Sequence, residues 1–600
     1  MVKISDFIFS FIENLGVKDV FMVSGGGNMH LVNSVGANKR LNYVCNHHEQ
    51  ASAIAAEAYS RVSENIGVCL VTSGPGGTNT ITGVLGAWLD SIPVLYISGQ
   101  VKRDVMVKKN KLRELGVQEA PIVDIVKPIT KYAVTVVNPQ KIKYHLEKAV
   151  FLAKNNRPGP VWLDIPLDVQ ASMIKEKSLK GFNPKSKKYL FLNKDLRQQV
   201  SKVITLIKKA KRPIIFAGHG IGLSKTRDIF ITTIEKLRIP VVTSMSATDT
   251  IKSNHDLFIG RPGVFGNRSG NFAVQNSDLL IVLGARLHLL NIGYDYKSFA
   301  RKAKKVVVDI DPAELKKKTI KPDLAINTNV KDFIIELNKQ INKIKSTDFS
   351  EWRKQCLDWK KRYPVVLPKY KTQKRYVNSY YFTEMLSDLL KEDEIIVTGV
   401  GTAKNGTIQS IKIKKRQHFY CNVGCAAMGY GLPAAIGACF ANNKKRIVLI
   451  IGDGGIMMNL QELQTVSYNK LPIKIFLLNN KGYLTIKNTQ NTFFNGNFVA
   501  STPKTGVSFP NFKKIAKAFN IRHETIKSHK KIQNKIRKAL NCNGPVLCEI
   551  NMSPNQSLRP KVCSRKRSDG TIISKPIEDM SPPLNRKEFF KNMIIKPIKK

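Results

Sequence analysis

The chain has 600 residues, 42% of them hydrophobic, and its 97 Lys and Arg outnumber its 44 Asp and Glu, for a net charge of +53. At ~150 residues per domain this length predicts three to four globular domains. No apolar run reaches the ~18–20 residues that a membrane-spanning helix needs, so no membrane partner is expected. The charge alone would suit a nucleic-acid-binding, non-catalytic protein. The lysines, however, are spread over linkers and helix surfaces, and no DNA- or RNA-binding motif is present, so we expect no nucleic-acid partner.

The first residues read as a structural element and not as a signal peptide. The stretch MVKISDFIFSFIENLG contains Asp6 and Glu13 inside its apolar pattern, which predicts an amphipathic first helix. Nine scattered cysteines form no zinc-ligand set. We therefore expect a cytoplasmic protein whose thiols are reduced.

The first predicted domain, residues 1–170, alternates apolar runs with helical stretches, and several strands end in glycine-rich turns such as VTSGPGG. This alternation is typical of a doubly wound parallel sheet. Within it, Glu49 stands where a strand passes into the alanine-rich helix EQASAIAAEAYSR. A carboxylate at a helix start is often only a cap. The small residues that follow indicate that a second helix approaches this one closely.

The middle of the chain repeats the same pattern after a linker rich in Lys, Pro and Ser at residues 171–190. The second domain, residues 191–342, contains the runs PIIFAGHGIG, DLLIVLGAR and VVVDIDP. Gly218 and Gly220 lie in the turn that follows its first strand. A single glycine-rich turn is weak support for a dinucleotide site, so the pattern by itself predicts only a second α/β domain.

The third domain, residues 376–555, follows a basic connector and precedes a turn-rich, basic tail at 556–600. The run RIVLIIGDGG ends a strand at Asp453, and the next strand, IKIFLL, ends at Asn480. The carboxyl ends of parallel strands meet at one edge of a sheet. We therefore expect these side chains to lie side by side, where their oxygens suit a hard cation that carries a phosphate.

Five stretches together carry a family resemblance. They are the GDGG…NN pair, the stretch around Glu49, VTSGPGG with its continuation to residue 99, TGVGTAKNG at 398–406 and NVGCAAMGYGLPAAIGA at 422–438. They resemble the thiamine diphosphate (ThDP)-dependent enzymes, and within them the acetolactate synthase branch. The resemblance implies an α/β fold of three doubly wound parallel-sheet domains, in the order pyrimidine-binding, central and diphosphate-binding.

The resemblance also assigns residues to the diphosphate end of ThDP. It implies that Asp453, Asn480 and the backbone carbonyl of Gly482 hold Mg²⁺, which takes six oxygen ligands. Met428 would prop the bent cofactor. The remaining cofactor-binding residues that it implies are Gly401, Thr402, Ala403, Ala426, Gly454 and Gly455.

At the pyrimidine end, Glu49 resembles the family's catalytic glutamate. By hydrogen-bonding the aminopyrimidine ring it would drive proton transfer within the cofactor, which is general acid–base catalysis. Gln118 matches a glutamine found beside the substrate in acetolactate synthases, and His30 in the SGGGNMH loop is a second candidate for the substrate pocket.

The central domain resembles the FAD-binding domain of acetolactate synthases. The implied FAD contacts include Gly218, Gly220 and Asp309. After GAR, however, this chain continues with LHLLNIG instead of the acidic and basic residues of those enzymes. Two alternatives stay open: FAD as a structural group, or a flavin-free domain as in decarboxylases of the same superfamily.

The predicted function is a carboligase that decarboxylates a 2-oxo acid, most simply pyruvate, and transfers the two-carbon unit to a second carbonyl. With pyruvate as acceptor the product is 2-acetolactate. The stretch after Asn480 and the tail depart from acetolactate synthases, so acetyl transfer to a keto-sugar nucleotide and a non-ligating decarboxylase remain alternatives. The resemblance implies a homodimer or homotetramer with active sites at the subunit interface, and it allows a small regulatory subunit.

Overall fold

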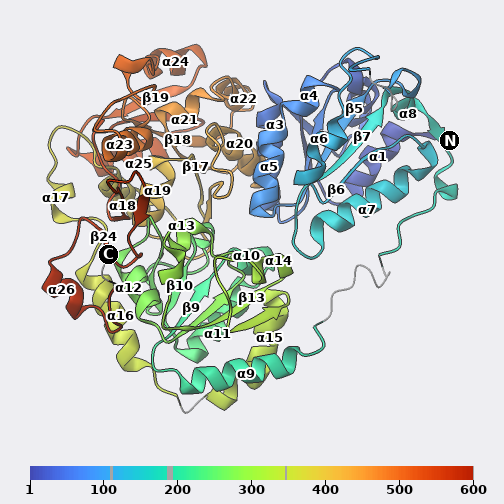
Figure 1. Ribbon diagram of the computed structural model, residues 1–600. Helices are drawn as coiled ribbons and strands as arrows, with labels where there is room; N and C mark the ends of the chain where they lie inside the picture. The colour runs from blue at the N-terminus through green and yellow to red at the C-terminus, as the bar shows by residue number, and fades with distance from the viewer. Residues whose placement is uncertain (108–111, 185–192, 345–346, 599–600) are drawn as a thin grey trace.

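The computed structural model describes residues 1–107, 112–184, 193–344 and 347–598. Three six-stranded sheets follow one another along the chain, each flanked by helices (Figure 1). Every strand pair within these three sheets is parallel. The predicted class of α/β fold, with three parallel-sheet domains, is confirmed. Residues 185–190 of the predicted linker and residue 191, the predicted start of the central domain, lie outside the described residues.

The N-terminal and C-terminal sheets have the same strand order. Counted along the chain within each sheet, the strands lie in the order 2-1-3-4-6-5. The N-terminal strands are β2 (Asp19–Met22), β3 (Asn42–Cys45), β4 (Gly67–Val71), β5 (Val94–Gln100), β6 (Tyr132–Thr135) and β7 (Val161–Pro166). The C-terminal strands are β15 (Ile395–Thr398), β16 (His418–Tyr420), β17 (Ile447–Gly452), β18 (Ile473–Asn479), β19 (Arg522–Ile526) and β20 (Val546–Asn551).

The central sheet has the order 3-2-1-4-5-6. This is the order of dinucleotide-binding folds, which bind their ligand where the strand order reverses. In this sheet the reversal falls between the first and fourth strands. The strands are β9 (Pro213–Ala217), β10 (Val241–Thr243), β11 (Phe258–Gly260), β12 (Leu279–Leu283), β13 (Lys304–Asp309) and β14 (Leu324–Asn327).

The N-terminal and C-terminal domains share one hydrophobic core. Its centre is the contact between α3 (Glu49–Ser63) and α20 (Gly431–Ala441), which face each other in Figure 1. A Cβ on Gly437 would lie 2.0 Å from the carbonyl oxygen of Ala55. The alanine-rich face of α3 and the glycine of α20 therefore allow the close helix approach that the sequence predicts.

The crossover between β17 and β18 contains two helices where the apolar spacing suggests one. These are α21 (Asp453–Met457) and α22 (Glu462–Tyr468). In the intervening turn, the Asn459 side chain donates to the Gln50 Oε1 at 2.9 Å and to the Gly429 carbonyl at 3.0 Å. The break thus places an amide that ties this crossover to two other segments of the chain.

The C-terminal tail wraps the central domain. Asn271 and Gln275 of α12 (Arg268–Asn276) donate to the Ile577 carbonyl at 2.7 Å and to the Glu578 carboxylate at 2.6 Å. The indole of Trp359 in α16 (Ser350–Arg362) donates to the Asn592 Oδ1 at 2.9 Å, next to α26 (Arg586–Lys591). These contacts fix the tail against the molecule.

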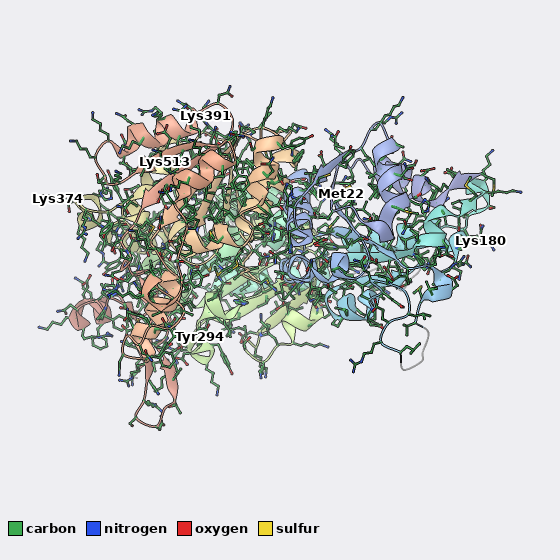
Figure 2. The ribbon with its side chains drawn as sticks, turned by 90° about the horizontal axis from the view of Figure 1, so that it is seen from above. Met22, Lys180, Tyr294, Lys374, Lys391 and Lys513 are labelled. Atoms are coloured by element: carbon green, nitrogen blue, oxygen red, sulfur yellow. The ribbon has the colours of Figure 1, made fainter. Side chains whose placement is uncertain are left out.

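Exposed lysines lie on more than one part of the molecule. In Figure 2, Lys180 lies at one end, and Lys374, Lys391 and Lys513 lie towards the other. Among the residues that the structure describes, no helix combines the length and apolar character needed to cross a bilayer.

Candidate functional site

Asp453 is held in a cradle of backbone amides at the carboxyl edge of the C-terminal sheet. It starts α21 directly after β17, and its Oδ1 accepts from the amide of Gly454 at 2.8 Å. Its Oδ2 accepts from the amides of Asn480 and Lys481 at 2.9 and 2.7 Å. The carboxylate is almost fully buried, and burial raises its pKa to about 6 against the opposing effect of these donors. The turn after β18 is therefore locked to the turn after β17.

The same turn presents an unused acceptor. Asn480 is buried, and its Oδ1 has no hydrogen-bond partner in the described part of the chain. A buried amide oxygen without a donor is costly, and a bound cation would satisfy it. One carboxylate, one amide oxygen and nearby backbone carbonyls form an all-oxygen set that suits Mg²⁺ with several positions left for other oxygens. The residues present therefore fit the implied metal.

A glycine turn and a helix start lie opposite this clamp. Gly401 caps α19 (Thr402–Ser410) at φ +65°, a conformation that favours glycine. The first amides of a helix lack intrahelical acceptors and attract anions. Both turns open into one cavity of about 420 Å³. Its lining includes all ten residues predicted for the diphosphate end: Gly401, Thr402, Ala403, Ala426, Met428, Asp453, Gly454, Gly455, Asn480 and Gly482.

Met428 and Ala426 form the wall of this cavity that follows β16. A Cβ on Gly454 would lie 3.3 Å from the Met428 methyl carbon, so the thioether packs against the metal-site turn. Ala426 has φ +52°, which is unusual for a residue with a Cβ. Its amide donates to the Asn422 Oδ1 at 2.8 Å. The loop is thus held in a strained conformation that lines the cavity.

Glu49 begins α3 at the edge of the N-terminal sheet. Its Oε2 accepts from the Asn79 Nδ2 at 3.0 Å. The neighbouring Gln50 is bonded through Asn459 to the carbonyl of Gly429, directly after Met428. This bridge brings the start of α3 next to the loop that carries Met428. Of the described residues, however, none from the N-terminal domain lines the 420 Å³ cavity.

The loop at 422–430 is clamped by buried charges of the N-terminal domain. Asp90, in α5 (Ile81–Asp90), accepts from the amides of Val423 and Gly424 at 3.1 and 3.0 Å. At the other end of the loop, the Tyr430 hydroxyl donates to Glu57 at 3.0 Å. Asp90 and Glu57 together hold the loop from both sides.

One arginine joins these two carboxylates. Arg61, on the last turn of α3, donates to Asp90 at 2.9 Å and is also paired with Glu57. All three side chains are buried. Burial raises the pKa of Glu57 although Arg61 opposes the rise, and the adjacent carboxylates hold the Arg61 pKa above its usual range. The helix that starts with Glu49 therefore also fixes the Met428 loop.

Two predicted substrate-pocket residues lie elsewhere on the N-terminal edge. Gln118 is exposed, and its carbonyl would lie 2.6 Å from a Cβ on Gly74. His30 is half-buried in α2 (Met29–Ala37), which follows the Gly25–Gly27 turn, and Gly27 donates to the Thr72 Oγ1 at 3.0 Å. The structure gathers these loops along one edge of the N-terminal sheet, outside the 420 Å³ cavity.

A second cavity, of about 260 Å³, lies at the strand-order reversal of the central sheet and extends to the N-terminal domain. Gly220 and Asp309 line it, together with Arg157 and Arg286. Gly218 is absent from the lining; a Cβ there would lie 2.1 Å from the Gly284 carbonyl, so this glycine brings two strand ends together. Burial raises the pKa of Asp309 to about 6.

The donor set of the second cavity suits a nucleotide. Burial lowers the pKa of His219 to about 4, and its Nε2 has no partner in the described chain. The Asn291 Nδ2 is likewise unpaired there. Neutral donors, two arginines and a carboxylate at a strand end match ribose and phosphate groups.

Sequence reasoning missed the clamp on the Met428 loop. Neither Asp90 nor Arg61 is assigned a role from the sequence. A charged residue in an apolar run, as in GAWLDS, was the available signal. Lys404, which lines the 420 Å³ cavity, was also missed, although it is the only charged residue of TGVGTAKNG.

Comparison with known proteins agrees with this geometry. Three family models match: the N-terminal TPP binding domain of thiamine pyrophosphate enzymes at residues 2–120, the central domain at 200–337 and the C-terminal TPP binding domain at 399–550. Thiamine pyrophosphate is a synonym of ThDP. "Acetolactate synthase 1, chloroplastic" from Zea mays is 33% identical over 580 residues, covering 94% of this chain and 87% of that protein. "Acetolactate synthase large subunit" from Porphyra purpurea is 31% identical over 571 residues, covering 94% of each.

Proposed function

The chain belongs to the acetolactate synthase-like branch of the ThDP-dependent enzymes, and on that premise we propose that it is a carboligase acting on pyruvate. It would decarboxylate one 2-oxo acid and join the two-carbon unit to a second carbonyl, giving 2-acetolactate when the acceptor is pyruvate. The observation that carries this proposal is the clamp in which the Asp453 carboxylate holds the backbone amide of Asn480, whose Oδ1 has no partner among the described residues, in one cavity with the start of α19.

Residues of the C-terminal domain would hold the cofactor. Asp453, the Asn480 Oδ1 and the Gly482 carbonyl would bind Mg²⁺, and the amides that follow Gly401 would bind the diphosphate. Met428 would support the ring system from below. When bound, ThDP would supply a carbon nucleophile for the substrate carbonyl and an electron sink for decarboxylation.

Glu49 would exchange a proton with the pyrimidine ring. Asn79 donates to the Oε2 of this carboxylate, which leaves Oε1 for the proton exchange. Gln118 and His30 would orient the substrate from the same edge.

A homodimer or homotetramer would complete the site. The proposal is supported by the separation of Glu49 from the lining of the 420 Å³ cavity, and by apolar residues exposed at the N-terminal edge, including Met29 and Val117, the latter 86% exposed. Apposition of this edge with the cavity of a second subunit would cover these side chains and bring a glutamate to each cofactor.

The second cavity would hold FAD. Gly220, Asp309, Arg286 and the unpaired His219 Nε2 support a bound nucleotide at that place. In the proposed reaction no net oxidation occurs, so the flavin would act as a structural group. Reconstitution of apoprotein with FAD, followed by flavin fluorescence after gel filtration, tests this assignment.

One observation favours a keto-sugar nucleotide as an alternative acceptor. The outer wall of the 420 Å³ cavity, formed by α23 (Leu484–Phe493), presents Thr485, Asn488 and Thr489. These side chains can hydrogen-bond the hydroxyl groups of a sugar, whereas a second pyruvate offers only a carbonyl and a carboxylate.

The test is a turnover assay with purified protein, ThDP, Mg²⁺ and pyruvate, with and without FAD. Acetolactate identifies the carboligase. Pyruvate loss that gives only acetaldehyde identifies a non-ligating decarboxylase, and pyruvate loss that depends on an added keto-sugar nucleotide identifies the alternative acceptor. No pyruvate consumption under any of these conditions would refute the proposed donor.

A further inference from the structure

Three lysines are buried in the described part of the chain: Lys404, Lys474 and Lys487. Two of them are paired with carbonyl or amide oxygens. Lys474 donates to the Gly544 carbonyl at 2.6 Å, and Lys487 donates to the Pro554 carbonyl at 2.7 Å. Lys404 is only 4% exposed and makes no hydrogen bond or ion pair with the described residues. Because buried charges are normally paired, we expect the partner of Lys404 to be an anionic group of a bound ligand.

Lys404 lies at the place where an anion would bind. It is the third residue of α19 and lines the 420 Å³ cavity beside Thr402 and Ala403, whose amides have no acceptor in the described chain. Its ammonium opposes the burial-driven rise in the pKa of the Cys421 thiol, directly after β16. Burial lowers the pKa of His288 and the same ammonium helps to lower it further, so the charge lies near Cys421 and near the central domain.

The charged residues of the cavity leave this cation without a counter-ion. Apart from Lys404, the ionised side chains of the lining are Asp453 and Lys561. Asp453 is already held by the turn after β18. Two further residues of the lining, Asn480 and Asn405, have a side-chain oxygen without a hydrogen-bond partner among the described residues.

We propose that Lys404 is a fixed cationic subsite that binds an anionic oxygen group within this cavity. The inference rests on the proposed function, which brings two such groups into the cavity: the diphosphate of ThDP and the carboxylate of the 2-oxo acid. A phosphate or carboxylate oxygen would form a charge-assisted hydrogen bond with the ammonium.

The test compares wild type with Lys404→Met and Lys404→Gln. Binding of ThDP, thiamine and inorganic diphosphate to apoprotein is measured by calorimetry, and the KM for pyruvate by turnover. If the group is the diphosphate, both variants weaken ThDP and inorganic diphosphate about 10- to 100-fold and leave thiamine unchanged. If it is the substrate carboxylate, ThDP binding is unchanged and the KM for pyruvate rises by a similar factor. Either result supports the subsite.

Lys513→Met is the matched control, since it removes the same charge from an exposed face of α24 (Phe512–Ala518) in the same domain (Figure 2). Unchanged ThDP affinity, diphosphate affinity and pyruvate KM in both Lys404 variants would overturn the inference. A lower melting temperature of the Lys404→Met apoprotein would also overturn it, because the loss of an unpaired buried charge should not destabilise the fold. A wild type that binds diphosphate but not ThDP would refute the proposed function and leave the subsite standing.

Discussion

The turn after β4 and the turn after β17 occupy the same place in two sheets of one strand order, yet only one of them carries a carboxylate. After β17 the chain reads GDGG, and Asp453 locks the neighbouring turn. After β4 it reads TSGPGG, and Thr72 directly follows the strand, where its hydroxyl accepts from the amide of Gly27 at 3.0 Å. The N-terminal turn is therefore linked to its neighbour through a hydroxyl and carries no carboxylate. Topology provides equivalent edges, and the turn residues decide which end of a ligand each can bind.

The segments that follow the second strand of the N-terminal and C-terminal sheets also carry different residues. In the N-terminal domain it leads to Glu49, and in the C-terminal domain it leads to Ala426 and Met428. In the proposed site these two segments act on the same end of ThDP, one as a proton exchanger and one as a support. Within one chain, Arg61, Asp90 and Glu57 join the helix that starts with Glu49 to the Met428 loop.

The largest expected effect comes from Glu49→Gln. Loss of a general acid–base group typically slows a reaction by about 10²- to 10⁴-fold. We expect kcat to fall in that range while the ThDP dissociation constant stays near its wild-type value, because no diphosphate ligand is changed. Asn79→Ala, which removes only the bond to Oε2, serves as the milder companion. Near-normal turnover of Glu49→Gln would show that Glu49, at the N-terminal edge, takes no part in the reaction.

Mixed oligomers test whether the two edges meet within one chain or between chains. Glu49→Gln and Asp453→Asn homo-oligomers should each be inactive. If a site takes Glu49 from one subunit and Asp453 from its partner, a mixed dimer contains one intact site and recovers up to about half of the wild-type activity per dimer. Co-expression with two affinity tags gives the mixed species. No recovery would mean that each chain builds its site alone.

Asp453→Asn should primarily weaken the binding of Mg²⁺ and ThDP, and not the chemical step itself. The amide keeps the size of the side chain but loses the charge that attracts Mg²⁺ and part of its capacity to accept from the turn amides. We expect the Mg²⁺-dependent affinity for ThDP to fall at least about 100-fold. Calorimetric titration with and without Mg²⁺ measures it. The corresponding change in the N-terminal sheet, Thr72→Val, removes the hydroxyl that accepts from Gly27 and no metal ligand. Equal ThDP affinity in both variants would therefore contradict the clamp.

Site residues that directly follow a strand could be predicted from the sequence. Site residues whose position depends on contacts between domains could not. Asp453 and Asn480 could be placed together because each directly follows a buried strand of one parallel sheet. Arg61, Asp90 and Tyr430 could not, since their meeting depends on how α3 packs against α20 and no local pattern specifies that. Lys404 could not be singled out from the sequence, because the lack of a partner for its charge among the described residues is visible only in the folded structure.

We expect the buried charges that hold the Met428 loop to affect activity by positioning that loop. Arg61→Met leaves two buried carboxylates without their cation, at a cost of about 3–5 kcal/mol in the free energy of unfolding. Tyr430→Phe is the gentler change, since it removes one hydrogen bond to Glu57 at about 1.5–3 kcal/mol. For Tyr430→Phe we expect kcat to fall several-fold with little change in the KM for pyruvate. Equal loss of kcat and ThDP affinity would point to general destabilisation instead.

The last prediction concerns two carboxylates, one on the sixth strand of the N-terminal sheet and one on the sixth strand of the C-terminal sheet. Asp164 on β7 is buried, and its pKa is raised to about 6 by burial despite hydrogen bonds from Ser98 and Gln100. Glu549 on β20 is hydrogen-bonded by His523, which lowers its pKa. The two groups therefore act on stability in opposite directions as pH changes.

The sign for each follows from linkage. Asp164 binds its proton more tightly in the folded state, so its stabilising contribution is complete below its unfolded pKa of 3.8 and is lost as pH rises through about 6. A shift of this size corresponds to about 3 kcal/mol. Glu549 stabilises the fold above the ordinary glutamate pKa and loses that contribution as pH falls through its lowered value. Asp164→Asn should flatten the decline in melting temperature between pH 4 and 7, whereas Glu549→Gln should flatten the loss on acidification. If neither slope changed, other groups would control the pH dependence of both domains.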